Sequence, residues 1–338
     1  MKSPITGKEM VLIKESKILT FRKEEFEVVY HHYKCEDSGE FFTTTELDEI
    51  NLNQLYNQYR AKHKLPFPEE VKQIREMYGL SALKISEVLG FGVNGYRNYE
   101  SGEVPSQSNA KLIQVAADPK EFKRLVERSD AYQGKALDKI LQSIDSLIRE
   151  QKQNRFKIQF ENYLIGLTDP SSTTGFKVPN FEKFTEMVVF FTEKMEPWKT
   201  KLNKLLFYAD FTMYAETGYS ISGVQYRAIP MGPVPNNFQS LYEFLANNSD
   251  VNIEYSTFSN GNSGEQFKPN SNRHFNPKLF PENELQILEE IAKRFIKTST
   301  QEIIKASHEE KAWIENSAGN KIIDYRYGFE LNSSEKFQ

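Results

Sequence analysis

The chain has 338 residues, of which 38% are hydrophobic and 13% aromatic, so it can build two or three packed domains. Its net charge of -4 excludes a protein that binds nucleic acid through overall positive charge, but not one with a local DNA-reading element. Cys35 is the single cysteine, so an intrachain disulfide is excluded. The N-terminal sequence lacks the apolar run of a signal peptide, and no stretch approaches the roughly 18 apolar residues of a membrane span. We therefore expect a cytoplasmic protein without membrane contact.

The first part of the chain predicts short strands followed by a helix. Residues 1–45 hold short runs of Val, Ile, Phe and Tyr separated by the turn sequences "TGK" and "EDSGE". Residues 46–64 place apolar side chains at helical spacing, and "LPFP" ends that pattern.

Residues 66–106 carry the signals of two short helices joined by a tight turn. Pro68 suits a first helical turn, Gly79 ends that helix, Ser81 can cap the next helix, and Gly90 ends it. A third helix is expected to begin near Val93 in "GFGVNGYRNYESG". This arrangement is the helix-turn-helix plan, in which one helix enters the major groove of DNA, and that helix would here be the one near Val93. The side chains available to touch bases would be Gly92, Val93, Asn94, Arg97 and Asn98.

Residues 68–128 predict several short helices, and residues 135–165 predict a long one. Six residues of the long helix form an apolar stripe: Leu137, Ile140, Leu141, Ile144, Leu147 and Ile148. Two interpretations stay open, a helix that joins domains or subunits and a helix that packs on its own domain. Residues 66–128 contain nine basic and nine acidic residues, so this part of the chain has no net positive charge. That balance weakens the case for DNA binding, because neutralising phosphates supplies most of the non-specific affinity for DNA.

The C-terminal half predicts a mostly helical domain. The polar segment 168–180 is the expected domain boundary. Helices are expected over 181–195, 200–218, 235–248, 281–296 and 298–316, with a hairpin-like excursion in "YSISGVQYRAIPMGPVP" and a polar loop over 259–277. The fold class is therefore α+β and mostly α.

The stretch "LSALKISEVLGFGVNGYRNYESG" resembles the Xre/Cro-type helix-turn-helix family, with Ala82 in place of the family's glutamine and "RNYE" in place of "SRYE". "GFGVNGY" is similar to the MqsA branch of antitoxins, and this resemblance implies that Asn94 reads bases. The position of that branch's second base reader is Asn98, which departs from the family pattern. A DNA-binding homodimer follows, because one small recognition helix seldom supplies enough affinity alone.

The N-terminal sequence resembles the zinc-binding module that precedes this helix-turn-helix in MqsA-like proteins. Its outline survives in "SPITGKEM" and "YKCEDSGEFF", but three of the four metal positions are Ser3, Thr6 and Ser38, and only Cys35 keeps a thiol. A structural zinc site needs four Cys or His ligands, which His31 and His32 beside Cys35 do not complete. We expect a degenerate ribbon without metal, with Phe- and Tyr-rich packing in place of the ligands and Cys35 buried as a small hydrophobe.

Residues 201–245, with "KLNKLLFYAD", "ISGVQYRAIPMGPVP" and the helix that carries Tyr242, resemble the Panacea (SocA-like) domain. This resemblance implies an antitoxin that neutralises a protein toxin encoded beside it. Toxin contacts are expected from the excursion, at Tyr226, Arg227, Met231 and Pro233, although a purely structural role for "MGPVP" stays open. His274 and His308 are isolated, and no paired acid and base, phosphate loop or metal spacing predicts an enzyme or a cofactor.

Together these patterns predict a type II antitoxin that also represses its own operon. The expected parts are a degenerate ribbon (1–64), an Xre-type helix-turn-helix (65–130), a connecting helix (131–168) and a Panacea toxin-binding domain (175–338). The expected partners are a cognate protein toxin and operator DNA. Two alternatives remain, a proteolysis adaptor and a prophage-type transcriptional regulator without a toxin.

Overall fold

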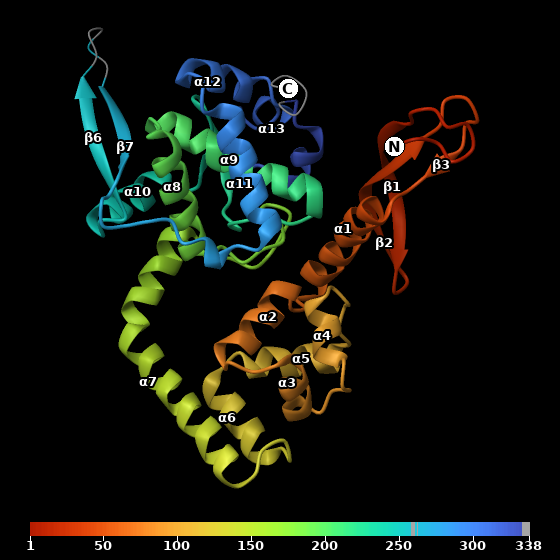
Figure 1. Cartoon of the computed structure of the whole chain (residues 1–338), viewed down its shortest axis with the longest axis vertical. Coiled ribbons are helices and arrows are strands. Elements are labelled where there is room, and N and C mark those ends of the chain that lie inside the picture. Colours follow the sequence, from red (N-terminus) through yellow and green to blue (C-terminus); the bar gives the residue numbers. More distant parts are fainter. Residues whose placement is uncertain (258–260, 262, 333–338) are drawn as a thin grey trace. The chain divides into compact units, whose positions relative to one another are not determined.

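The computed structural model describes residues 1–257, 261 and 263–332, and it divides the chain into two compact units, Met1–Phe160 and Glu161–Gln338. Helices are the main secondary structure of both units, and the described residues add three small antiparallel sheets (Figure 1). The predicted class, α+β and mostly α, is confirmed. The division falls inside a long helix, whereas the segment 168–180, where the sequence predicts the boundary, packs within the second unit through Gly175 and Ser220.

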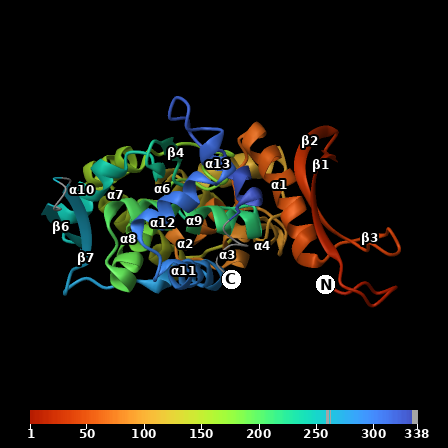
Figure 2. The same cartoon turned by 90° about the horizontal axis from the view of Figure 1, so that it is seen from above.

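The first unit begins with a long hairpin and a helix beside it. Its strands are β1 (Val11–Phe21), β2 (Glu24–Lys34) and β3 (Phe41–Phe42), in the order β1-β2-β3. Arg22 and Lys23 form the two-residue turn, both with positive φ, which suits the twist of a tight hairpin. Helix α1 (Thr45–His63) lies along β2 in both views of the chain (Figure 2).

Two amide side chains of α1 complete the hydrogen bonding of β2. Asn51 both accepts from the His31 amide and donates to its carbonyl, at 2.8 and 2.9 Å. Gln54 makes the same pair of bonds to Val29, at 2.9 and 2.8 Å. Buried backbone N–H and C=O groups need hydrogen-bond partners, and at these residues of β2 the side chains of Asn51 and Gln54 supply them in place of a neighbouring strand. These hydrogen bonds fix α1 against the sheet.

A bundle of short helices follows in the same unit. Its members are α2 (Pro68–Met77), α3 (Ala82–Leu89), α4 (Gly95–Glu100), α5 (Gln107–Ala116), α6 (Pro119–Arg128) and the first turns of α7 (Gly134–Ile165). The boundary signals act as predicted: Pro68 opens α2, the Ser81 hydroxyl accepts from the Lys84 amide, and Gly90 ends α3 in the left-handed conformation. Helix α4 begins at Gly95, two residues later than predicted.

The apolar stripe of α7 packs on this bundle. Ile140 and Ile144 are buried in the bundle core with Val71, Ile85 and Tyr96. The other four stripe residues, Leu137, Leu141, Leu147 and Ile148, are partly buried against the same core. Of the two interpretations left open by the sequence, packing on its own domain is therefore the one observed for this half of the helix.

The second unit is built around helix α9 (Lys199–Thr217), most of whose residues are buried. Around it lie α8 (Phe181–Met195), α10 (Phe238–Asn247), α11 (Glu282–Phe295), α12 (Thr300–His308), α13 (Lys311–Ile314) and the short 3-10 turns η1 (Pro277–Leu279) and η2 (Tyr325–Glu330). The predicted excursion is confirmed as a hairpin of β4 (Tyr226–Ile229) and β5 (Gly232–Pro235).

Two expectations for the second unit are corrected. The predicted polar loop 259–277 contains strand β7 (Ser263–Pro269), which pairs with β6 (Val251–Thr257), while positions 259, 260 and 262 lie outside the described residues. The single helix expected over 298–316 is two helices, because the chain turns at Glu309 and Glu310 between α12 and α13. Glu310 is buried there, with its carboxylate 3.3 Å from the Tyr208 hydroxyl.

Candidate functional sites

The five residues predicted to touch DNA share the exposed side of α4 and the turn before it. Gly92, Val93, Asn94, Arg97 and Asn98 are all exposed, and Val93 is 72% exposed. Asn94 stands at the N-terminal end of α4 but its side chain makes no capping bond. Within the described part of the chain, no ion pair occupies Arg97. The arrangement leaves two amides and one guanidinium, the groups that pair best with adenine and guanine edges, open to solvent.

The opposite side of α4 is fixed in the bundle core. Tyr96 is fully buried and its hydroxyl donates to the Val71 carbonyl at 2.7 Å, and its amide donates to the Ser86 hydroxyl at 3.1 Å. Tyr99 is also buried and accepts from the Asn109 amide side chain at 2.8 Å. The two tyrosines hold α4 with its exposed side outward.

Several cations of the bundle are paired with acids. Arg75 binds Glu100, and Lys84 binds Glu87 and the Ala131 carbonyl. Further pairs join Lys72 to Glu76, Arg124 to Glu121 and Lys123 to Asp145. These pairs reduce the number of cations on the bundle that are free to neutralise phosphates.

Two arginines tie the segment after α4 to the N-terminal module, a feature the sequence did not reveal. Arg22, in the hairpin turn, donates to the carbonyls of Val104 and Pro105 at 2.7 and 3.1 Å. Arg60, buried in α1, donates to the Gly102 carbonyl and to Asn57. An arginine guanidinium carries five N–H donors in one plane, so a single side chain can bond to several carbonyl oxygens. These two arginines therefore hold α4 at a set position relative to the hairpin.

The four positions that the ribbon resemblance assigns to metal come together in space. The Ser3 hydroxyl accepts from the amides of Ile5 and Thr6, both at 3.3 Å, and the Ser38 hydroxyl accepts from the Glu40 amide at 3.4 Å. The Thr6 hydroxyl lies 3.4 Å from Cys35 Sγ. We call Ser3, Thr6 and Ser38 the hydroxyl triad.

The hydroxyl triad corrects one expectation about Cys35. Cys35 is buried, as predicted, but its thiol has the hydroxyls of Thr6, Ser38 and Ser3 as hydrogen-bond partners and is not packed as a purely apolar group. Hydrogen bonds from Ser38, Thr6 and Ser3 lower the pKa of the thiol to about 6, because they stabilise the thiolate.

These residues do not fit a zinc ion. Hydroxyls stand where three thiolates are needed, and the described residues contain no group of three or more His, Cys, Asp or Glu placed to hold a metal. His31 is buried, and desolvation followed by the charge of Lys14 lowers its pKa to about 4.

In the second unit, the four predicted toxin contacts separate into buried and accessible residues. Tyr226 has no exposed surface, and its hydroxyl donates to Asp210 at 2.7 Å. Pro233 is buried, and its carbonyl accepts from Lys204 Nζ at 3.0 Å. Arg227 is half-buried and donates to the Asn320 carbonyl at 2.7 Å, whereas Met231 is 50% exposed at the hairpin tip. Only Arg227 and Met231 are placed to contact a partner.

Asp210 is the buried polar centre of this unit. Its carboxylate accepts from the amides of Ile221 and Ser222, both at 2.8 Å, from the Ser222 hydroxyl at 2.6 Å and from Tyr226. Burial raises the pKa of the carboxyl, while these four donors oppose the shift. The cluster fixes the chain between α9 and β4, and thereby the hairpin.

Lys204 fixes the other strand of the hairpin. It is fully buried, and desolvation lowers its pKa to about 7. Gly232, at φ 95°, lies directly over it: a Cβ there would be 2.6 Å from both Lys204 Cε and Ser307 Oγ. The glycine of "MGPVP" is thus required by close packing, which supports the structural interpretation of that motif.

Aromatic and apolar side chains that the sequence did not single out surround the hairpin tip. Trp313 Nε1 donates to the Ile229 carbonyl at 2.8 Å, and the His308 ring stacks on Trp313 with ring centroids 3.9 Å apart. Ile314 is 54% exposed beside them. We call Met231, Trp313 and Ile314 the tip patch.

The described residues contain no helix that is long and apolar enough to cross a membrane. No curated protein matches the chain. Residues 202–314, about a third of the chain, match the family described as antitoxin SocA-like, Panacea domain. That family is not a class of enzymes, and the match supports an antitoxin role for this segment.

Proposed function

We propose that the chain is a cytoplasmic type II antitoxin whose C-terminal domain, residues 175–338, binds a cognate protein toxin and blocks it by direct contact. The observation that carries this proposal is the match of residues 202–314 to the antitoxin family. The packing around α9 supports it, because buried polar side chains that are hydrogen-bonded to the hairpin hold Arg227 and Met231 at fixed positions. A partner thus meets a preorganised surface, which reduces the entropic cost of binding.

The same proposal assigns DNA binding to the helix-turn-helix of residues 65–130. The chain would act as a homodimer that represses its own operon, with α4 in the major groove of each half-site. The exposed row of Gly92, Val93, Asn94, Arg97 and Asn98 supports this role. Asn94 would read adenine, and Arg97 would contact guanine or a phosphate.

The N-terminal and connecting parts are proposed to be structural. Residues 1–64 form a ribbon that folds without zinc, because the hydroxyl triad replaces three ligands. Arg22 and Arg60 would transmit the position of this ribbon to α4. Residues 131–168 connect the DNA-binding and toxin-binding parts.

Co-expression with the product of the neighbouring gene tests the proposal. Growth is measured with the neighbour alone, with the neighbour and this chain, and with the neighbour and a chain truncated after residue 160. The neighbour alone should stop growth, the full chain should restore it, and the truncated chain should not. A harmless neighbour, or rescue by the truncated chain, would contradict toxin binding by the C-terminal domain. Co-purification of this chain with an ATP-dependent protease and no toxin would favour the adaptor alternative.

A further inference from the structure

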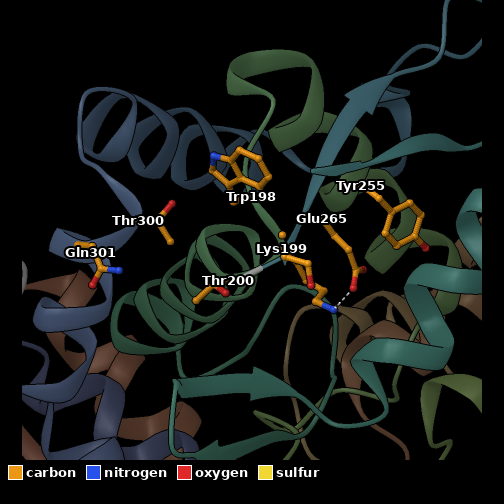
Figure 3. Close-up of a pocket in the computed structure, with 9 residues that line it drawn as sticks. Trp198, Lys199, Thr200, Tyr255, Glu265, Thr300 and Gln301 are labelled. Atoms are coloured by element: carbon orange, nitrogen blue, oxygen red, sulfur yellow. Dashed lines mark hydrogen bonds and ion pairs between the residues drawn. The ribbon is translucent and has the colours of Figure 1, made fainter. Parts of the chain in front are cut away.

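A cavity of about 440 Å³ lies in the second unit, where α9 and α12 begin and the β6–β7 hairpin passes (Figure 3). Its walls combine two aromatic side chains with small or polar ones. The described residues that line it are Trp198, Lys199, Thr200, Tyr255, Ser263, Gly264, Glu265, Thr300 and Gln301. Its volume is within the range of protein binding pockets.

The wall formed by the hairpin is fixed to the start of α9. The Phe267 amide donates to the Pro197 carbonyl at 2.9 Å, and Gln266 Nε2 donates to the Glu196 carbonyl at 3.0 Å. Lys199 and Glu265 form an ion pair at the cavity, which Figure 3 marks with a dashed line. These bonds join segments about 70 residues apart in sequence, so the cavity is formed before any partner arrives.

The rim of the cavity has the composition of a protein interface. Tyr255 is 75% exposed on β6, and Trp198 is half-buried at the start of α9. Exposed Tyr and Trp beside a concave site are the side chains that most often carry binding energy between proteins. Around them, Thr300 and Gln301 offer hydroxyl and amide groups for hydrogen bonds.

One helix connects this cavity to the tip patch. Helix α12 begins at the cavity with Thr300 and ends at His308, which stacks on Trp313 of the tip patch. Nine helical residues extend about 13 Å. A protein interface of ordinary size covers about 800 Å² on each partner, so it would include both the cavity and the tip patch. A small molecule would occupy the cavity without reaching the tip patch. The continuity of the two features therefore favours a protein as occupant.

We propose that the toxin inserts an aromatic side chain with a hydrogen-bonding end into this cavity, and that its surface continues along α12 to the tip patch. The inserted ring would stack against Trp198 and Tyr255, and its polar end would bond to Thr200, Thr300 or Gln301. This inference rests on the proposed antitoxin function and adds the docking surface to it.

Two variants test the cavity without disturbing the core. Gln301→Trp places a large ring at the exposed start of α12 and fills the cavity, and Tyr255→Ala removes the exposed ring. Tyr163→Ala is the matched control, since Tyr163 is 77% exposed on α7, away from the lining residues. Affinity for the neighbouring gene's product is measured by titration of the full chain, after growth rescue has shown that the wild type neutralises it.

We expect Gln301→Trp and Tyr255→Ala each to weaken binding by about 30-fold or more, the size of an interface hot spot, and Tyr163→Ala to bind like the wild type. Melting temperatures show that each variant is folded. If Gln301→Trp binds within threefold of the wild type, the inference is wrong whatever Tyr255→Ala does. If the wild type itself neither binds nor rescues, the antitoxin proposal fails instead, so the two failures are distinct.

Discussion

Lys204 allows a quantitative test of how the C-terminal unit holds the β4–β5 hairpin. The amine is fully buried, and its one hydrogen bond within the described residues goes to the Pro233 carbonyl. Its pKa falls from the reference 10.5 to about 7 in the folded chain. Between about pH 7 and pH 10.5 the Lys204 amine is protonated in the unfolded chain but neutral in the folded chain. The free energy of unfolding therefore rises with pH in this range.

The size of the effect follows from the shift. One pKa unit corresponds to 1.36 kcal/mol, so Lys204 contributes a slope of roughly 1.3 kcal/mol per pH unit, or about 2.5 kcal/mol between pH 7.5 and 9.5. Lys204→Met should remove this slope, because Met fills the same space without a titrating group. The buried tyrosines around α9 have raised pKa values and lose stability only above pH 10, outside this window.

Urea unfolding at pH 7.5, 8.5 and 9.5, followed by tryptophan fluorescence, provides the assay. Both tryptophans of the chain, Trp198 and Trp313, lie in the second unit, so the signal reports on that unit alone. The exposed Lys297 gives a control, Lys297→Met, which should keep the wild-type slope. Equal slopes for the wild type and Lys204→Met would refute the reasoning, because Lys204 would then keep its proton in the folded core.

Three further predictions concern the remaining sites. Asn94→Ala combined with Arg97→Ala should weaken operator binding by at least about a hundredfold in a gel-shift assay while leaving toxin neutralisation intact; loss of neutralisation would show that the two activities are not separable. Purified wild-type chain should contain no stoichiometric zinc by elemental analysis, whereas a variant with all three residues of the hydroxyl triad replaced by Cys should bind one zinc per chain; zinc in the wild type would overturn the degenerate-ribbon proposal. Gly232→Ala should lower the free energy of unfolding by about 2 kcal/mol or more, because its Cβ would overlap Lys204 and Ser307, and an unchanged urea midpoint would contradict that packing.

Periodicity and boundary residues predicted the helices of both units well. The Ser81 cap, the Gly90 end and the buried face of α3 all act locally, so a short window of sequence contains them. The hairpin formed by β4 and β5 was predictable for the same reason, because Pro and Gly mark its turn.

The features that the sequence did not reveal depend on distant partners. Lys204 and Asp210 look like surface positions of a helix, yet both are buried, because Pro233 and Tyr226 supply their hydrogen bonds from the hairpin. Strand β7 lies in a Gly- and Asn-rich stretch and is defined by its pairing with β6. Arg60 likewise reaches a carbonyl 42 residues away in sequence. Polar residues buried by tertiary contacts have no local signal.

The proposed antitoxin function requires that the C-terminal domain forms a direct complex with a toxin. The most direct measurement is size-exclusion chromatography with light scattering on the purified full chain mixed with the purified product of the neighbouring gene. We expect the wild-type chain to form a stable complex of defined stoichiometry, and Gln301→Trp not to form it. Two separate peaks with the wild-type chain, from a neighbour whose toxicity this chain relieves, would contradict neutralisation by direct contact.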